Sequence, residues 1–201
     1  MYKNIIVTIP GKRDSTIYVT CHYDKIDTNI LSFVNLLING YLDYLLAPTY
    51  LTSGKYDNGT GVFLSLRLMD KLLKRENKYS YVFLFTGLEE YGLRGARTHV
   101  SKLNLEEYSK IKYVINIDMV GSKENINSIG VSADVSDKLL LSHLRGIAAN
   151  NGLSLYEEEI KKSGGSGDFD AFMGTSFGKE FSRSINMNLI SAFLPQKSYF
   201  Y

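Results

Sequence analysis

Two short, nearly uninterrupted apolar runs constrain the fold of this chain more than any other feature. Residues 81–86 read YVFLFT and are followed by Gly87, and residues 112–117 read KYVINI and are followed by Asp118. A strand at the surface alternates apolar and polar residues, whereas a strand covered on both faces is apolar almost throughout. The two runs therefore predict buried strands of a mainly parallel sheet, with helices on both of its faces.

The rest of the chain alternates between strand and helix patterns. Residues 62–73 carry apolar side chains at helical spacing, which predicts an amphipathic helix. Further strands are expected at residues 4–9, 16–21, 126–131, 155–159 and 185–190, further helices at residues 93–102 and 135–150, and a partly helical segment at residues 30–51. The turn-like residues 10–14 indicate that the first two strands form a hairpin. We expect a three-layer α/β/α sandwich with a mixed, mainly parallel central sheet, built as one domain over residues 1–201.

The composition excludes several classes of partner and of fold. The chain has 23 basic and 21 acidic residues, a formal net charge of +2, which gives no electrostatic reason to expect nucleic acid or an anionic membrane as partner. No segment reaches the roughly 20 consecutive apolar residues of a membrane span. The single cysteine, Cys21, cannot form an internal disulfide. A cytoplasmic location is expected on this ground, and a secreted mature form stays open.

Histidine and acidic side chains gather where the expected strands end or the expected helices begin. Four segments carry them: CHYD at residues 21–24, YDNGTG at 56–61, TGLEEYG at 86–92 and INIDMVG at 115–121. Ligands of parallel sheets usually bind beyond the carboxyl ends of the strands, where these segments fall. Imidazole and carboxylate are the ligands that zinc accepts besides thiolate, and one cysteine cannot form a thiolate cage. A mixed histidine and carboxylate metal site is therefore expected.

The adjacent acidic residues Glu89 and Glu90 allow two interpretations. Neighbouring side chains in a turning chain point in different directions, so one glutamate can bind a metal while the other acts on the substrate as general base. Alternatively, both glutamates lie in the first turn of the following helix, where the helix dipole favours negative charge. The local sequence does not decide between the two.

Taken together and in this order, HYD, DNGTG, GLEEYGLRGA and NIDMVG resemble the co-catalytic di-zinc aminopeptidases, the family that includes aminopeptidase Y, glutamate carboxypeptidase and glutaminyl cyclase. The resemblance runs from about residue 4 to residue 172. It implies a metallo-aminopeptidase that uses Zn²⁺, two ions in the family, and that takes a peptide or a small aminoacyl compound as substrate. Such an enzyme hydrolyses the N-terminal peptide bond with metal-activated water.

The resemblance also implies a role for each site residue. His22 and Asp118 would bind one zinc ion, Asp57 would bridge both ions, and Glu90 would bind the other. Glu89 would be the general base. Asp24 would orient the His22 imidazole, as a carboxylate often does for a histidine bound to metal. A cis peptide bond between Asp57 and Asn58 is implied as well.

Two features near the carboxyl end bear on how complete the site is. The segment GSGDFDAF at residues 165–172 is similar to a family loop on the substrate side, with Asp168 and Phe172 matching. The family's last zinc ligand, a histidine in a His-Thr-x-x-Asp segment, has no counterpart before Tyr201, and His99 and His143 are expected to be surface or packing residues. We therefore expect a domain that is incomplete at its carboxyl end, with a weak or absent second zinc. A catalytically impaired or truncated member and a glutaminyl cyclase-like enzyme stay open as alternatives.

Overall fold

The computed structural model describes residues 2–25, 54–120, 128–132, 137–158, 166–173 and 188–193. The expected helical segment at residues 30–51 lies outside the described residues. The described strands are β1 (Ile5–Ile9), β2 (Arg13–His22), β3 (Tyr79–Thr86), β4 (Ile111–Ile117), β5 (Ser128–Ser132), β6 (Ser154–Glu158) and β7 (Asn188–Phe193). The described helices are α4 (Gly59–Leu73), α5 (Arg94–Val100), α6 (Leu105–Ser109), α7 (Lys138–Asn150) and α8 (Phe169–Met173).

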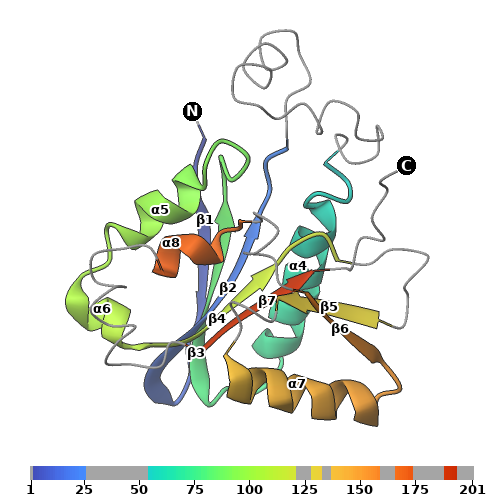
Figure 1. Cartoon of the computed structure of the whole chain (residues 1–201). Helices are drawn as coiled ribbons and strands as arrows, with labels where there is room; N and C mark the ends of the chain where they lie inside the picture. The colour runs from blue at the N-terminus through green and yellow to red at the C-terminus, as the bar shows by residue number, and fades with distance from the viewer. Residues whose placement is uncertain are drawn as a thin grey trace, which may run out of the picture.

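The strands form one mixed sheet with the order β1-β3-β2-β4-β7-β5-β6 (Figure 1). β2 is parallel to both β3 and β4, β4 is parallel to β7, and β5 is parallel to β6. The two antiparallel pairs are β1 with β3 and β5 with β7. The expected mixed, mainly parallel sheet is confirmed, and the buried runs around residues 81–86 and 112–117 are its interior strands β3 and β4.

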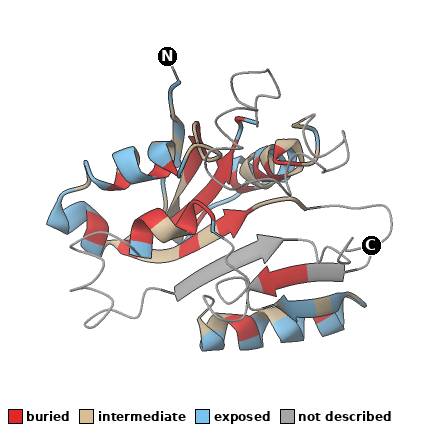
Figure 2. Ribbon diagram, turned by 45° about the horizontal axis from the view of Figure 1, so that its top comes forward, coloured by how far each residue is buried: buried red, intermediate tan, exposed pale blue. Residues whose placement is uncertain are grey.

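Helices cover both faces of the sheet, so the expected three-layer sandwich is confirmed (Figure 1). On one face, Leu84 and Val114 pack with Ala96 of α5, Tyr108 of α6 and Phe172 of α8. On the other face, strand residues including Val19, Phe83 and Phe85 pack against Leu72 of α4. Figure 2 shows that the central strands are buried while the helices expose their outer sides. Among the described residues, no helix is long and apolar enough to cross a membrane.

The hairpin expected between the first two strands is wrong. β3 lies between β1 and β2, and it is antiparallel to β1 and parallel to β2. The turn crosses the beginning of β3, where Lys12 N donates to Asn77 O at 3.0 Å and Arg13 N donates to Lys78 O at 2.9 Å. A side chain at Gly11 would lie 2.1 Å from the backbone carbon of Tyr79, so only glycine fits this crossing. The turn residues correctly indicated that the chain reverses direction, but the strand between β1 and β2 is β3, which begins only at Tyr79.

Candidate metal centre

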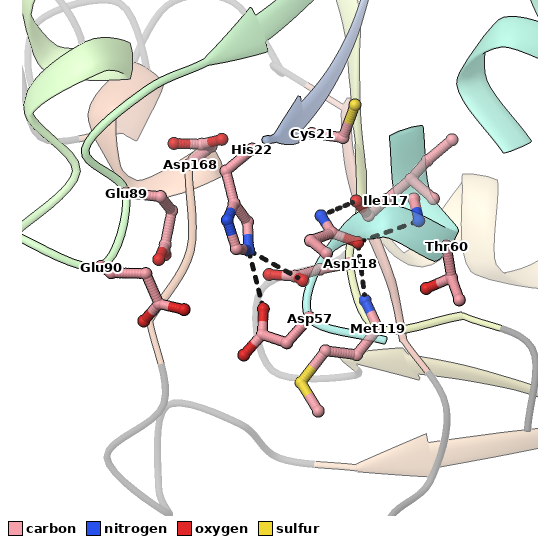
Figure 3. Close-up of polar contacts among 12 residues, drawn as sticks. Cys21, His22, Asp57, Thr60, Glu89, Glu90, Ile117, Asp118, Met119 and Asp168 are labelled. Carbon is pink, nitrogen blue, oxygen red and sulfur yellow. Dashed lines mark hydrogen bonds and ion pairs between the residues drawn. The ribbon is translucent and has the colours of Figure 1, made fainter. Parts of the chain in front are cut away.

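The central strands bring the predicted site residues to one edge of the sheet. His22 is the last residue of β2, Asp118 directly follows β4, and Glu89 and Glu90 lie in the loop that follows β3. Asp57 precedes α4, whose first residue is Gly59. Figure 3 shows the His22 ring between the two glutamates on one side and Asp57 with Asp118 on the other. Because β2, β3 and β4 are parallel neighbours, their carboxyl ends meet at this edge.

One nitrogen of His22 faces two carboxylates. Its Nε2 atom lies 3.0 Å from Asp57 Oδ1 and 3.3 Å from Asp118 Oδ1 (Figure 3). The His22 side chain is only 2% exposed, so its ring is shielded from bulk water and interacts with these carboxylates instead. Burial opposes the charged form of the ring, but Asp118, Asp24 and Asp57 outweigh it and raise the pKa of His22. Without a metal, a single Nε2 proton therefore stands between two acceptors, and Asp118 Oδ1 makes no hydrogen bond of good geometry within the described residues.

These three side chains fit a divalent metal ion. Four donors arranged tetrahedrally at about 2.0 Å from a zinc ion lie roughly 3.3 Å from one another. The distances of 3.0 and 3.3 Å between Nε2 and the two carboxylate oxygens agree with that spacing. Single donor atoms of His22, Asp57 and Asp118 all lie within 4.8 Å of one another. An imidazole with two carboxylates is a donor set suited to zinc, and a cation would satisfy the buried Asp118 oxygen.

Asp24 connects the other side of the His22 ring to the glutamate-bearing loop. His22 Nδ1 lies 3.2 Å from the backbone carbonyl oxygen of Asp24 and 3.6 Å from its carboxylate Oδ1. The same carboxylate accepts hydrogen bonds from the amides of Glu89, at 3.1 Å, and Glu90, at 3.4 Å. Burial raises the pKa of Asp24, but His22 and the Glu89 amide outweigh it and lower the pKa overall. Asp24 is thus held as an anion that orients His22 through both its carbonyl and its carboxylate.

Glu89 and Glu90 face the ring, and the interpretation that places them in the first turn of a helix is wrong. α5 begins only at Arg94, four residues after Glu90. One carboxylate oxygen from each glutamate lies within 4.8 Å of a His22 ring nitrogen and of the other glutamate. Burial is the largest cause that raises the pKa of Glu89 to about 9 and that of Glu90 to about 8; nearby acidic residues add to the rise and His22 opposes it. Both carboxyl groups are therefore mainly protonated near neutral pH in the metal-free protein. The positive charge of a bound metal ion would favour their ionised forms, which can serve as a ligand and as a general base.

Asn58 has a structural role at the site that the sequence did not predict. Its Oδ1 atom accepts hydrogen bonds from Gly61 N at 3.0 Å and Met119 N at 3.1 Å, and its Nδ2 atom donates to Ile117 O at 2.9 Å. Asn58 is 1% exposed and caps the amino end of α4. It therefore ties the segment that carries Asp57 to the segment that carries Asp118. The signal in the sequence was an asparagine directly before the amphipathic helix, which is a typical N-cap.

A cis peptide bond and a close backbone approach lie on either side of Asn58. The peptide bond between Asp57 and Asn58 is cis, as the resemblance implied. A side chain at Gly61 would lie 2.2 Å from Asn58 Oδ1 and 2.6 Å from Ile117 O. Glycine at position 61 thus allows the first turn of α4 to approach the end of β4 closely.

Asp168 and Phe172 are buried side chains, 1% and 0% exposed. The expectation that the loop that carries them lies on the substrate side stays a prediction. Asp168 Oδ2 accepts a hydrogen bond from Thr86 Oγ1 at 2.5 Å, and its Oδ1 atom has no partner within the described part of the chain. Burial raises the pKa of Asp168 to about 7. Phe172 packs against Tyr18 in the core, which explains why an aromatic residue occupies this position.

The remaining histidines do not contribute to the site, as predicted. His99 Nε2 lies 3.2 Å from the hydroxyl of Tyr18, and the two rings are in contact. His143 is an exposed residue of α7. His22 is therefore the one histidine of the three in this chain that lies at the metal centre.

Comparison with known proteins agrees with the class that the fold and donor set define, a metal-dependent hydrolase domain. The chain belongs to peptidase family M28, whose family model matches residues 4–179. It is 29% identical over 156 residues to leucine aminopeptidase 1 of Pyrenophora tritici-repentis, covering 72% of this chain and 36% of that protein. It is 28% identical over 134 residues to an aminopeptidase of Pseudomonas aeruginosa, covering 67% of this chain and 23% of that protein.

Solved structures show the same fold. A zinc aminopeptidase from Bacillus subtilis superposes with a TM-score of 0.68 at 21% identity, covering 98% of this chain and 41% of that chain. A glutaminyl cyclase from an Acidobacteriales bacterium superposes with a TM-score of 0.65 at 22% identity, covering 94% of this chain and 57% of that chain. The chain spans well under half the length of the curated relatives that it matches.

Proposed function

We propose that this chain carries the catalytic core of a zinc-dependent aminopeptidase, which hydrolyses the N-terminal peptide bond of a peptide or a small aminoacyl amide. The observation that carries the proposal is the buried Nε2 atom of His22, which lies 3.0 Å from Asp57 and 3.3 Å from Asp118. Membership of peptidase family M28 supports peptide hydrolysis as the reaction. The names of several relatives, which are aminopeptidases, support the amino end of the substrate as the site of cleavage.

His22, Asp57 and Asp118 would hold one zinc ion, and Glu90 together with Asp57 would contribute to a second. When bound, zinc polarises the scissile carbonyl and lowers the pKa of a water molecule to near neutrality. The first position has three protein donors, as catalytic zinc sites usually do, whereas the second has two among these residues, one of them shared. We therefore propose one tightly bound and one weakly bound zinc ion per chain.

Glu89 would move the proton during the reaction. Its buried carboxyl group lies beside His22, and its pKa is raised to about 9 in the protein without metal. Positive charge nearby favours the ionised form of a carboxyl group and brings such a pKa down towards neutrality, where a general base is most effective. A Glu89 oxygen then accepts a proton from the attacking water and donates it to the nitrogen of the leaving amine.

Asp24 would hold the His22 ring and the two glutamates in fixed relative positions. Its carbonyl oxygen and carboxylate contact His22 Nδ1, and its carboxylate also accepts from the amides of Glu89 and Glu90. A histidine whose second nitrogen is held in this way presents Nε2 in a fixed direction. Asp24 is thus a positioning residue that fixes the ring and the glutamates relative to each other.

The test combines zinc calorimetry with a fluorogenic aminoacyl-amide assay on the same preparation. We expect the His22→Ala variant to lose at least about 100-fold in zinc affinity, together with its hydrolytic activity. The matched control is His143→Ala, which removes an exposed histidine of α7 and should change neither quantity. Unchanged zinc binding in His22→Ala would refute the metal site. Cyclisation of N-terminal glutaminyl peptides without hydrolysis of aminoacyl amides would refute the aminopeptidase and favour a glutaminyl cyclase.

A further inference from the structure

The loop that carries both glutamates has an unusual backbone. We name residues 87–93, between β3 and α5, the glutamate loop. Leu88 and Leu93 have positive φ angles of 61° and 59°, and Gly92 has a φ angle of 90°. Residues other than glycine seldom adopt such angles, so the surrounding structure must hold this loop in place. The loop therefore needs contacts from outside, and those contacts help to decide where Glu89 and Glu90 lie.

Hydrogen bonds within the glutamate loop wind it tightly but do not fix it to the sheet. Gly92 N and Leu93 N donate to Glu89 O at 3.0 and 2.8 Å, and Arg94 N donates to Leu88 O at 3.0 Å. At the side that faces the metal centre, the loop is held by Asp24 through the amides of Glu89 and Glu90. A third set of contacts holds the base of the loop, where the chain leaves β3 and enters α5.

At that base, the two ends of the glutamate loop come into backbone contact beside Asn4. A side chain at Gly95 would lie 2.2 Å from Gly87 O, 2.9 Å from Gly87 N and 2.6 Å from Asn4 Oδ1. Asn4 Nδ2 donates to Gly95 O at 2.8 Å, while Asn4 Oδ1 accepts from Gly87 N at 3.3 Å. The single side-chain amide of Asn4 thus bonds to Gly87, the first residue of the loop, and to Gly95, in the first turn of α5 just after the loop; these partners are 83 and 91 residues away in the sequence.

The position of Asn4 suits such a clamp. Asn4 directly precedes β1, which pairs antiparallel with β3 and places Ile5 opposite Phe85. Asn4 is thereby carried to the level at which β3 ends and the glutamate loop begins. The neighbouring Lys3 adds a second contact, because its carbonyl oxygen accepts a hydrogen bond from the Tyr23 hydroxyl. Tyr23 N in turn donates to Thr86 O at 2.9 Å, so the start of β1 is anchored beside the loop.

We propose that Asn4 is a positioning residue, which closes the base of the glutamate loop and thereby fixes Glu89 and Glu90 relative to His22. Its importance for turnover rests on the proposed aminopeptidase function, whereas its effect on the loop does not. The clamp needs a donor towards Gly95 O and an acceptor towards Gly87 N on one short side chain, which asparagine provides. Alanine provides neither group, and aspartate keeps the acceptor while directing a carboxylate at Gly95 O.

Hydrogen exchange measured by mass spectrometry on the zinc-free protein tests the clamp without any reference to activity. In Asn4→Ala we expect the amides of Gly92, Leu93 and Arg94 to exchange at least about 10-fold faster, because their bonds depend on a closed base. The amides of β3 should keep their wild-type rates. The matched control is Thr8→Ala, which changes an exposed polar residue of the same edge strand, opposite Val82 and away from the loop. Loop exchange at the wild-type rate in Asn4→Ala would overturn the proposal, and so would equal acceleration throughout β1 and β3.

Steady-state kinetics then test the effect on the glutamates. In Asn4→Ala we expect kcat to fall by about 10- to 100-fold with KM within about twofold, since a small displacement of a catalytic group costs rate rather than binding. Zinc affinity at His22, Asp57 and Asp118 should stay within about threefold of the wild type. Asn4→Asp should not restore kcat, because it lacks the donor. A kcat within twofold of the wild type in Asn4→Ala would overturn the proposal. If the wild-type protein hydrolyses no aminoacyl amide, the proposed function fails and the exchange experiment alone decides the clamp.

Discussion

Asn58 Oδ1 accepts a hydrogen bond from the backbone amide of Met119 at 3.1 Å, and this contact joins the two segments that present Asp57 and Asp118 to His22. Met119 has a positive φ angle of 48°, so the chain turns sharply immediately after Asp118. The geometry of the metal centre therefore depends on a neutral side chain that is not itself a candidate ligand.

Asn58→Ala should destabilise the protein and weaken zinc binding together. The change removes the cap of α4 and the hydrogen bonds of Asn58 with Met119 N and Ile117 O, which we expect to cost roughly 2–4 kcal/mol of unfolding free energy. Zinc affinity should fall by about 10- to 100-fold, as for other residues that support metal ligands. Chemical denaturation and calorimetry measure the two effects.

The matched control for Asn58 is Asn104→Ala. Asn104 caps α6 through an exposed capping box with Glu107 and lies outside the metal centre. It should lose about 1 kcal/mol of stability and no zinc affinity. Equal zinc affinity in the two variants would show that Asn58 does not position Asp57 and Asp118.

Glu89→Gln should separate turnover from metal binding. Glutamine keeps the size of the side chain but cannot accept the proton, so the hydrolysis rate should fall by about 100-fold or more. Zinc affinity should stay within a few-fold of the wild type, whereas Glu90→Gln should weaken the second zinc ion. Rate and calorimetric measurements on both variants decide the assignment. A Glu89→Gln protein with nearly full activity would exclude Glu89 as the general base.

Much of this architecture could be predicted from the sequence, because local patterns determined it. Continuous apolar runs identified β3 and β4 as buried strands, and the residues at their ends are those of the candidate metal centre. The helix predicted at residues 62–73 is α4, which starts three residues earlier at Gly59. Those features depend on a period of hydrophobicity or on the end of a run, and both can be seen in a single sequence.

Contacts between distant segments could not be predicted in the same way. The position of β3 between β1 and β2, and the contacts of Asn4 with Gly87 and Gly95, join residues far apart in the chain. The short helix α6 was missed although Asn104 and Glu107 form a capping box, since five residues are too few for a helical period. Which residues share a contact across the sheet is decided by tertiary packing, to which local propensity is a weak guide.

The metal-free protein should lose stability as the pH rises from about 5 to 9. The pKa of Glu89 is raised from 4.5 to about 9 and that of Asp168 from 3.8 to about 7, in both cases mainly by burial. The folded state therefore holds more protons than the unfolded state in this range, and the free energy of unfolding falls with rising pH. Melting temperatures of chelator-treated protein at several pH values measure the trend, and Glu89→Gln should flatten its upper part. A melting temperature that rises over this range would contradict the assignment of raised pKa values.

Zinc binding should release protons, and its affinity should rise with pH. In the protein without metal, the carboxylates of Asp118, Asp24 and Asp57 raise the pKa of His22 against the opposing effect of burial, so the ring is protonated on both nitrogens near neutral pH. A metal ion can bind Nε2 only after that nitrogen has lost its proton. At least one proton per zinc ion should therefore be released between pH 6 and 8, and the association constant should rise by about tenfold per pH unit for each proton released.

Calorimetric titrations in two buffers with different enthalpies of ionisation count these protons directly. His143→Ala should release the same number as the wild type, because that exposed histidine lies on α7, away from the centre. Zinc binding that releases no proton over this range would mean that Nε2 of His22 is already free, or that the ion binds elsewhere.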